Sequence, residues 1–238
     1  MADNKKIEKA LYGPSTTEVA LGAILGLGAG LLFACVYLVF KPVLQVKEMP
    51  KEKDVVRGAV YYLPGSDNST KGKGYVAKQK SLIAGTGVDL TEDELNAWAT
   101  ATFGAAANKP AAKPATPGKE GGDAGAGYDG IFNPGTPNFK IVGGNLQIGT
   151  KCVLNWYGLT KEVVVIAVGN FARSGDDVVF VPQQLFLGSC PVHMIPKLAD
   201  PLMGHLVGRK KLPDEIKSAW AKVSNATIES GTLKLTME

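Results

Sequence analysis

Residues 189–194, with the sequence SCPVHM, come closest to offering chemistry in this chain. Cys190, His193 and Met194 are soft metal ligands, and copper sites of the cupredoxin kind combine such a set with a second histidine. That second histidine usually lies upstream, whereas the only other histidine here is His205, downstream in a predicted helix. The spacing therefore does not predict a copper site.

A structural zinc site would need four ligands. The one set that the sequence offers consists of Cys152, Cys190, His193 and His205. Nothing in the spacing of these residues requires a metal, so we predict neither a metal nor another cofactor. Pro191 has no backbone N–H to donate to a neighbouring strand, so we expect a strand over 185–190 to end there and SCPVHM to be a turn.

The cysteines have a second interpretation, because Cys152 and Cys190 both fall in or beside predicted strands and could be sheet neighbours. In an extracytoplasmic domain, such neighbours could form a disulfide. In a reducing compartment they would be small, buried core residues. The chain has three cysteines, which can close at most one pair, so a disulfide framework is excluded.

The sequence lacks the common catalytic signatures. It contains no G-x-S-x-G elbow, no Walker loop and no H-E-x-x-H helix. With two histidines, acid–base chemistry would have to depend on Asp and Glu, most of which fall in predicted caps, turns or charged tethers. A net charge of +4 without a clustered basic face argues against a nucleic-acid partner. We predict a protein that is not an enzyme and has no catalytic residues.

An apolar segment near the N-terminus predicts a membrane anchor. Residues 19–40 carry no charge, and as a helix they would span roughly 33 Å, enough to cross the hydrocarbon core. Residues 32–35 (LFAC) weakly resemble a lipoprotein cleavage motif. Phe33 is too bulky for that motif, and the apolar run continues past Cys35 to Phe40. We therefore predict an uncleaved transmembrane helix rather than a cleaved leader.

Small residues recur every four positions along this segment, at Gly22, Gly26, Gly30 and Ala34. On a helix this spacing forms one stripe, along which a second helix can approach closely. The stripe predicts helix association, as a homo-oligomer or with other membrane subunits. The alternative is that glycine is simply frequent in membrane helices.

Flanking charges and overall organisation predict different orientations of the anchor. Lysines at 5, 6 and 9 precede it, whereas five basic residues follow between 41 and 57. Charge alone would keep the C-terminal region in the cytoplasm. The short N-terminal leader and the family resemblance described below favour an anchor in the cell inner membrane with an extracytoplasmic, periplasmic C-terminal domain.

Composition divides the chain into a few regions. We expect an N-terminal tail (1–18), the transmembrane helix (19–40), a charged tether (41–54) and a membrane-tethered α+β domain (55–238). The domain should begin with a strand over 55–63, which is β-branched and aromatic and stops at Pro64-Gly65. An Ala-, Pro- and Gly-rich insert at 104–127 has almost nothing to bury and is predicted to be disordered.

A capping box predicts a helix that begins near residue 91. Thr91 can cap the helix while Glu94 reaches back to it, and Leu90 can contact Leu95 across the cap. The acids at 92–94 fit a structural role at the positive end of the helix dipole. One apolar face follows at helical spacing, formed by Leu95, Trp98, Ala99, Thr102 and Phe103.

A hairpin is predicted around Gly143-Gly144. A two-residue loop there would pair Ile141 with Leu146 and Phe139 with Ile148, and it would place all four apolar residues on one face. The same register places two polar residues, Lys140 and Gln147, on the other face.

The remaining segments complete an α+β pattern. Runs at 163–171 and 178–187 are apolar on both faces in places, so something other than water must cover them. Helices are expected from Pro201 and over 216–223, and a strand over 226–237 closes the chain. The fold class is therefore α+β, with a single N-terminal transmembrane helix followed by a curved antiparallel β-meander packed with a few short helices.

The chain resembles a group of uncharacterised bacterial single-pass envelope proteins, broadly similar to the YpmS type. The resemblance depends on the glycine-rich anchor followed by LTEDELNAW, NFKIVGGNLQIG and FVPQQLFLGSCPV, and it covers residue 55 to the end apart from the insert. It implies an outer domain related to tubular lipid-binding domains, with no catalytic residues to carry over.

Two functions are consistent with these observations. The first is a membrane-anchored, non-enzymatic protein whose outer domain binds a lipid or another hydrophobic ligand in an apolar groove between sheet and helices. The alternative is a structural or accessory subunit of a multi-protein envelope complex, assembled through the glycine stripe and the outer domain.

Overall fold

The computed structural model describes residues 13–66, 68–107, 132–156, 159–195, 197, 199, 202 and 212–237. Its helices are α2 (Thr16–Phe40), η1 (Glu52–Asp54), α3 (Ser69–Gly72), α4 (Tyr75–Ile83), α5 (Glu92–Ala107), η2 (Val192–Met194) and α7 (Asp214–Trp220). Its strands are β1 (Leu44–Gln45), β2 (Tyr61–Tyr62), β3 (Val88–Thr91), β4 (Phe132–Val142), β5 (Asn145–Trp156), β6 (Leu159–Ser174), β7 (Asp177–Leu187), β8 (Cys190–Pro191), β9 (Val223–Glu229) and β10 (Thr232–Met237).

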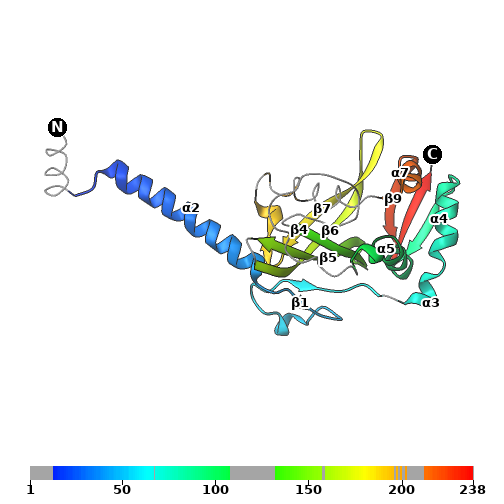
Figure 1. Cartoon of the computed structure of the whole chain (residues 1–238), viewed down its shortest axis with the longest axis horizontal. Helices are drawn as coiled ribbons and strands as arrows, with labels where there is room; N and C mark the ends of the chain where they lie inside the picture. The colour runs from blue at the N-terminus through cyan, green and yellow to red at the C-terminus, as the bar shows by residue number, and fades with distance from the viewer. Residues whose placement is uncertain are drawn as a thin grey trace, which may run out of the picture.

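Helix α2 projects alone from one end of the molecule, with the sheets at its C-terminal end (Figure 1). It begins at a capping box, in which the backbone N–H of Glu18 donates to Ser15 Oγ (3.3 Å) and that of Ser15 donates to Glu18 Oε2 (3.2 Å). Among the described residues, α2 is the one helix long and apolar enough to cross a membrane. By length and composition alone, it would equally fit a signal sequence.

Five antiparallel strands form a meander in the order β4-β5-β6-β7-β8. The predicted hairpin is confirmed in register, since Ile141 pairs with Leu146 and Phe139 with Ile148. Gly143 and Gly144 have φ angles of 58° and 77°, the left-handed conformation that a two-residue hairpin turn of this kind requires.

A second, three-stranded antiparallel sheet has the order β3-β10-β9 and lies at the end of the molecule far from α2 (Figure 1). The single closing strand predicted over 226–237 is instead a hairpin, because the chain reverses at Ser230 and Gly231, both with positive φ. The hairpin pairs with β3, so the last strand is joined to the segment that immediately precedes α5.

The helices predicted from residue 91 and over 216–223 are present as α5 and α7, the second in part. α7 buries Ile216 and Ala219 but ends at Trp220, and Val223, predicted on the same helix, begins β9. Apart from Leu202, the helix predicted from Pro201 falls largely on residues outside the described part of the chain. The predicted insert begins four residues too early, because 104–107 still belong to α5, and the rest of it lies outside the described residues.

Two apolar clusters form the core. The first joins the three-stranded sheet and helices α4, α5 and α7 to β5 and β7, and its buried members are Leu82, Val88, Leu95, Leu146, Val178, Ala219, Val223, Ala226, Leu233 and Leu235. The second lies within the meander, and its buried members are Cys152, Val163, Val165, Ala167, Leu185 and Val192. Val39, from the end of α2, packs against the second cluster.

The segment between α2 and the meander packs on the sheet. Leu44 N–H donates to Val60 O (2.9 Å) and Val46 N–H to Tyr62 O (3.0 Å), which makes β1 and β2 a short parallel pair. The predicted strand over 55–63 is therefore wrong for most of its length, because only Tyr61 and Tyr62 pair. We call residues 61–66 the strap, since they cross from the β1–β2 pair to α5.

Candidate functional site

The most informative site is the joint between helix α2 and the domain, formed by residues 35–42 and 188–190. Residues 16–34 of α2 are exposed, whereas Cys35, Leu38 and Val39 are half-buried. These three positions share one helical face, so a single side of the last turns lies against the domain.

Hydrogen bonds from one buried serine hold the joint. Ser189 N–H donates to Leu38 O (2.9 Å), and Ser189 Oγ donates to Lys41 O (3.2 Å) and Pro42 O (3.4 Å). The last carbonyls of a helix have no intrahelical partner, and here the domain supplies one for Leu38. The end of α2 is thereby hydrogen-bonded to the turn between β7 and β8.

A glycine allows this close approach. Gly188 has a φ of 58°, and a Cβ added there would overlap the carbonyl oxygen of Val39 and lie 2.9 Å from its carbonyl carbon. Gly188 N–H donates to Val164 O (2.8 Å), which fixes the glycine to the neighbouring strand β6. Only a residue without a side chain fits between α2 and β6 at this point.

The SCPVHM segment is a structural part of the joint. The strand predicted through residue 190 ends instead at Leu187, and the chain turns and returns as β8, in which Pro191 pairs with Phe186. His193 Nδ1 lies 3.0 Å from Leu185 O and 3.2 Å from Leu185 N. The His193 and Phe186 rings pack edge to face, with their centroids 5.1 Å apart. The histidine thus fastens the segment to β7.

The predicted disulfide partners are not neighbours. Cys152 lies on β5 and Cys190 on β8, with β6 and β7 between them, so the prediction that they are sheet neighbours is wrong. Cys190 instead lies beside α2, where the Cys35 thiol interacts with it. Burial raises the pKa of the Cys190 thiol, and Cys35 raises it further.

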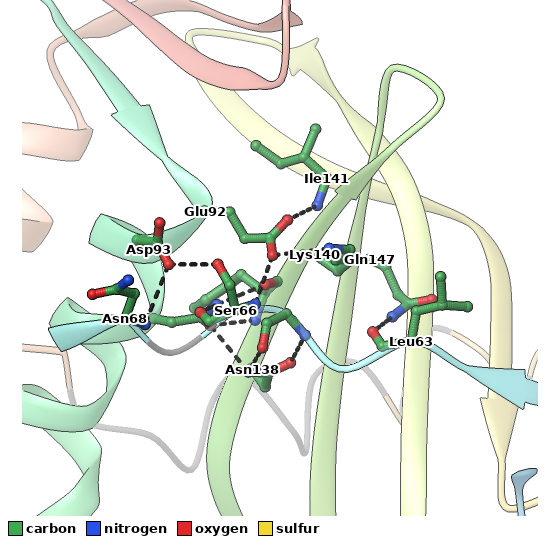
Figure 2. A network of polar contacts seen from close by, with 12 residues as sticks. Leu63, Ser66, Asn68, Glu92, Asp93, Asn138, Lys140, Ile141 and Gln147 are labelled. Carbon is green, nitrogen blue, oxygen red and sulfur yellow. Dashed lines mark hydrogen bonds and ion pairs between the residues drawn. The ribbon is translucent and has the colours of Figure 1, made fainter. Parts of the chain in front are cut away.

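Polar side chains fasten the strap across the meander (Figure 2). Asn138 Oδ1 accepts hydrogen bonds from Gly65 N–H (2.6 Å) and Tyr62 Oη (2.9 Å), and the buried Gln147 Nε2 donates to Leu63 O (2.6 Å). Burial raises the pKa of Tyr62 to about 12, so its hydroxyl remains a donor at neutral pH. Gln147, from the predicted polar face of the hairpin, therefore binds the strap together with Asn138, which was not predicted.

Helix α5 closes the exposed edge of the meander. Asn96 is 3% exposed, and its side chain donates to Phe139 O (2.8 Å) and accepts from Phe139 N–H (2.7 Å). One turn earlier, Glu92 Oε2 accepts from Ile141 N–H (3.1 Å). These outward-facing groups of β4 would otherwise be an unpaired sheet edge. Asn96 was not predicted as a site residue; the signal in the sequence was its four-residue spacing from Glu92.

The first-turn acids of α5 have structural partners. Glu92 Oε1 accepts from Ser66 N–H (2.6 Å) and forms an ion pair with Lys140 (3.1 Å) (Figure 2). Asp93 accepts from Ser66 Oγ and from Asn68 N–H (3.3 Å). Each acid therefore ties α5 to the strap or to β4, as the predicted structural role requires.

The predicted capping box is confirmed and gives a testable pH dependence. Glu94 Oε2 accepts from Thr91 N–H (2.8 Å) and Lys78 Nζ (2.7 Å). Burial alone would raise the pKa of Glu94, but the hydrogen bonds from Lys78 and Thr91 outweigh it and lower the pKa below its usual range. A lowered folded-state pKa stabilises the fold above the unfolded pKa, and this stability is lost as the pH falls through the folded pKa.

We therefore expect acid to destabilise the wild-type protein more steeply than Glu94→Gln. The measurement is the guanidinium unfolding midpoint between pH 7 and pH 3. Glu229→Gln is the matched control, because Glu229 is exposed. Its unfolding midpoint should fall with pH as steeply as that of the wild type. Equal slopes for Glu94→Gln and the wild type would contradict the role of Glu94.

The predicted stripe of small residues lies open along α2. A Cβ added at Gly22, Gly26 or Gly30 would meet nothing within 4 Å, and Ala34 is likewise exposed. Within the described residues, no packing contact requires glycine at these three positions.

An open depression is lined by 85–89 and 234–237, where β3 meets β10, with a volume of about 480 Å³. Its lining mixes Asp89, Lys234 and the backbone of glycines with a few apolar side chains. This depression is not the enclosed apolar groove that lipid binding would need.

Potential metal ligands do not gather within the described part of the chain, where no group of three or more His, Cys, Asp or Glu side chains is placed to hold an ion. His205, a member of the zinc set considered from sequence, lies outside the described residues.

No protein-family model matches the sequence, and neither the curated proteins nor the solved structures give a match. The resemblance to the YpmS type stays a prediction, and the function must be inferred from the chain's own joint, strap and anchor.

Proposed function

We propose that this chain is a membrane-anchored, non-enzymatic accessory subunit that holds its α+β domain in a fixed orientation at the bilayer within a multi-protein envelope complex. The observation that carries the proposal is the joint, in which Ser189 hydrogen-bonds the last turn of α2 and Gly188 leaves room for it. A freely swinging tether would need no such contacts.

The joint favours a retained anchor over a cleaved leader. Cleavage after the apolar run would remove Leu38 and Val39, uncovering the second core cluster and the Ser189 N–H. The exposed part of α2, residues 16–34, would span ~28 Å, close to the ~30 Å of a hydrocarbon core. The bilayer would then end where the domain begins. We place this anchor in the cell inner membrane with the domain on the periplasmic side.

An accessory role fits the geometry better than lipid carriage. The depression at β3 and β10 is open and partly polar, whereas the anchor exposes a row of small residues that the fold does not use. A domain fixed relative to its anchor can present one surface to neighbours in the same membrane.

Chemical crosslinking in intact membranes tests this proposal. The wild-type chain should give a discrete adduct of higher mass, and Gly26→Leu should reduce it several-fold because the side chain blocks close helix approach. Gly28→Leu is the matched control, since Gly28 is equally open but lies on the opposite side of the helix. A chain that stays monomeric, or adducts insensitive to Gly26→Leu, would contradict helix association.

A further inference from the structure

Two thiols from distant parts of the sequence meet at the joint. Cys35 is half-buried on α2, and Cys190 is 2% exposed on β8. The hydrogen bond from Ser189 N–H to Leu38 O (2.9 Å) fixes the residue before Cys190 to the residue one turn after Cys35. This backbone hydrogen bond holds the segments that carry the two cysteines against each other.

The proximity of the two segments allows a covalent bond. Residues of α2 and β8 lie within 8 Å of each other, measured between Cα atoms, and β8 consists of Cys190 and Pro191. The Cys35 thiol is close enough to raise the pKa of the Cys190 thiol. A disulfide joins Cα atoms 4.4–6.8 Å apart, a range that this proximity allows. The third thiol, Cys152, lies on β5 in the second core cluster, with two strands between it and Cys190.

We propose that Cys35 and Cys190 are a redox latch: on oxidation they form a disulfide that joins the anchor helix covalently to the domain. The proposal rests on the proposed function, because removal of the helix would remove Cys35. The oxidant is a disulfide, either a small molecule or a protein. In an extracytoplasmic compartment, such oxidants maintain structural disulfides.

The exchange balances in two steps. The more accessible Cys35 attacks the oxidant as its thiolate, forms a mixed disulfide and releases one thiol. The Cys190 thiolate then attacks the Cys35 sulfur and releases the second thiol. Two protein thiols are oxidised to one disulfide, and one disulfide oxidant is reduced to two thiols. The product makes permanent an orientation that hydrogen bonds hold in the reduced state.

The test uses the full-length protein in detergent micelles, incubated with oxidised glutathione or with dithiothreitol, then denatured and alkylated with a maleimide. Intact mass should show three alkylated cysteines in the reduced sample and one in the oxidised sample. Peptide mapping should link Cys35 to Cys190. Cys35→Ser and Cys190→Ser should each abolish the link, whereas Cys152→Ser should retain it. Since Cys190 is buried and its variant could misfold, Cys35→Ser on the anchor is the decisive one.

The outcomes separate the latch from the proposed function. A mature mass lacking the anchor overturns the proposed function. Four other results overturn the latch and leave the anchor intact. They are a full-length mass with three alkylated cysteines after oxidation, a stable glutathione adduct on Cys35, a link to Cys152, and a Cys35–Cys35 dimer.

Discussion

Replacing Asn96 by leucine should lower the free energy of unfolding by about 3 kcal/mol. Leucine has a similar size, so water stays excluded while the N–H and the carbonyl of Phe139 lose their partners. Each buried polar group left unpaired costs roughly 1–3 kcal/mol. Ser66 O, which accepts from Asn96 Nδ2 at 2.8 Å, loses a partner as well, so the strap should loosen together with the sheet edge.

The measurement is guanidinium unfolding of the full-length chain in micelles, followed by tryptophan fluorescence. Asn225→Leu is the matched control, because Asn225 is exposed on β9 and its replacement should change the free energy of unfolding by no more than about 0.5 kcal/mol. If both variants unfolded at the same midpoint, the edge-closing role of Asn96 would be refuted.

Local signals explain what the sequence predicted well. The β4–β5 hairpin requires only that two glycines take positive φ and that apolar residues alternate on either side, and both requirements are visible in residues 139–148. The start of α5 is similarly local, because Thr91 and Glu94 satisfy each other across three positions. No distant part of the chain is needed to fix either feature.

The strap shows where local reasoning fails. Residues 55–63, which lead into the strap, are β-branched and aromatic and predict a strand. A strand, however, needs a neighbouring strand with free backbone groups. Here side chains take that role instead, since Asn138 and Gln147 bind the backbone of Gly65 and Leu63. These partners lie more than seventy positions away, so propensity could not reveal them.

The joint fails local prediction for the same reason. The sequence predicted Cys152 as the partner of Cys190, but β6 and β7 lie between their two strands. Contact with Cys35 depends on how the end of α2 returns against the β7–β8 turn, which no spacing in the sequence encodes. The apolar helix was predicted from composition; its docking on the domain was not.

Substituting Gly188 by alanine should detach the anchor from the domain. The added Cβ would overlap Val39 O, and this backbone oxygen can yield only if the last turn of α2 moves away. Moving that turn breaks the hydrogen bond from Ser189 to Leu38 and withdraws Val39 from the second core cluster. Since alanine at positive φ adds about 1 kcal/mol of strain, we expect a total loss of roughly 3 kcal/mol or more.

Gly175→Ala separates these two effects. Gly175 has a φ of 64°, close to that of Gly188, but its added Cβ would meet nothing within 4 Å. It should therefore show the backbone strain alone, about 1 kcal/mol, with the joint intact. Limited proteolysis in micelles should cut between 41 and 60 faster in Gly188→Ala than in Gly175→Ala. Equal cleavage would mean that the last turn of α2 is not held by the domain, and the fixed orientation proposed for this subunit would have no physical basis.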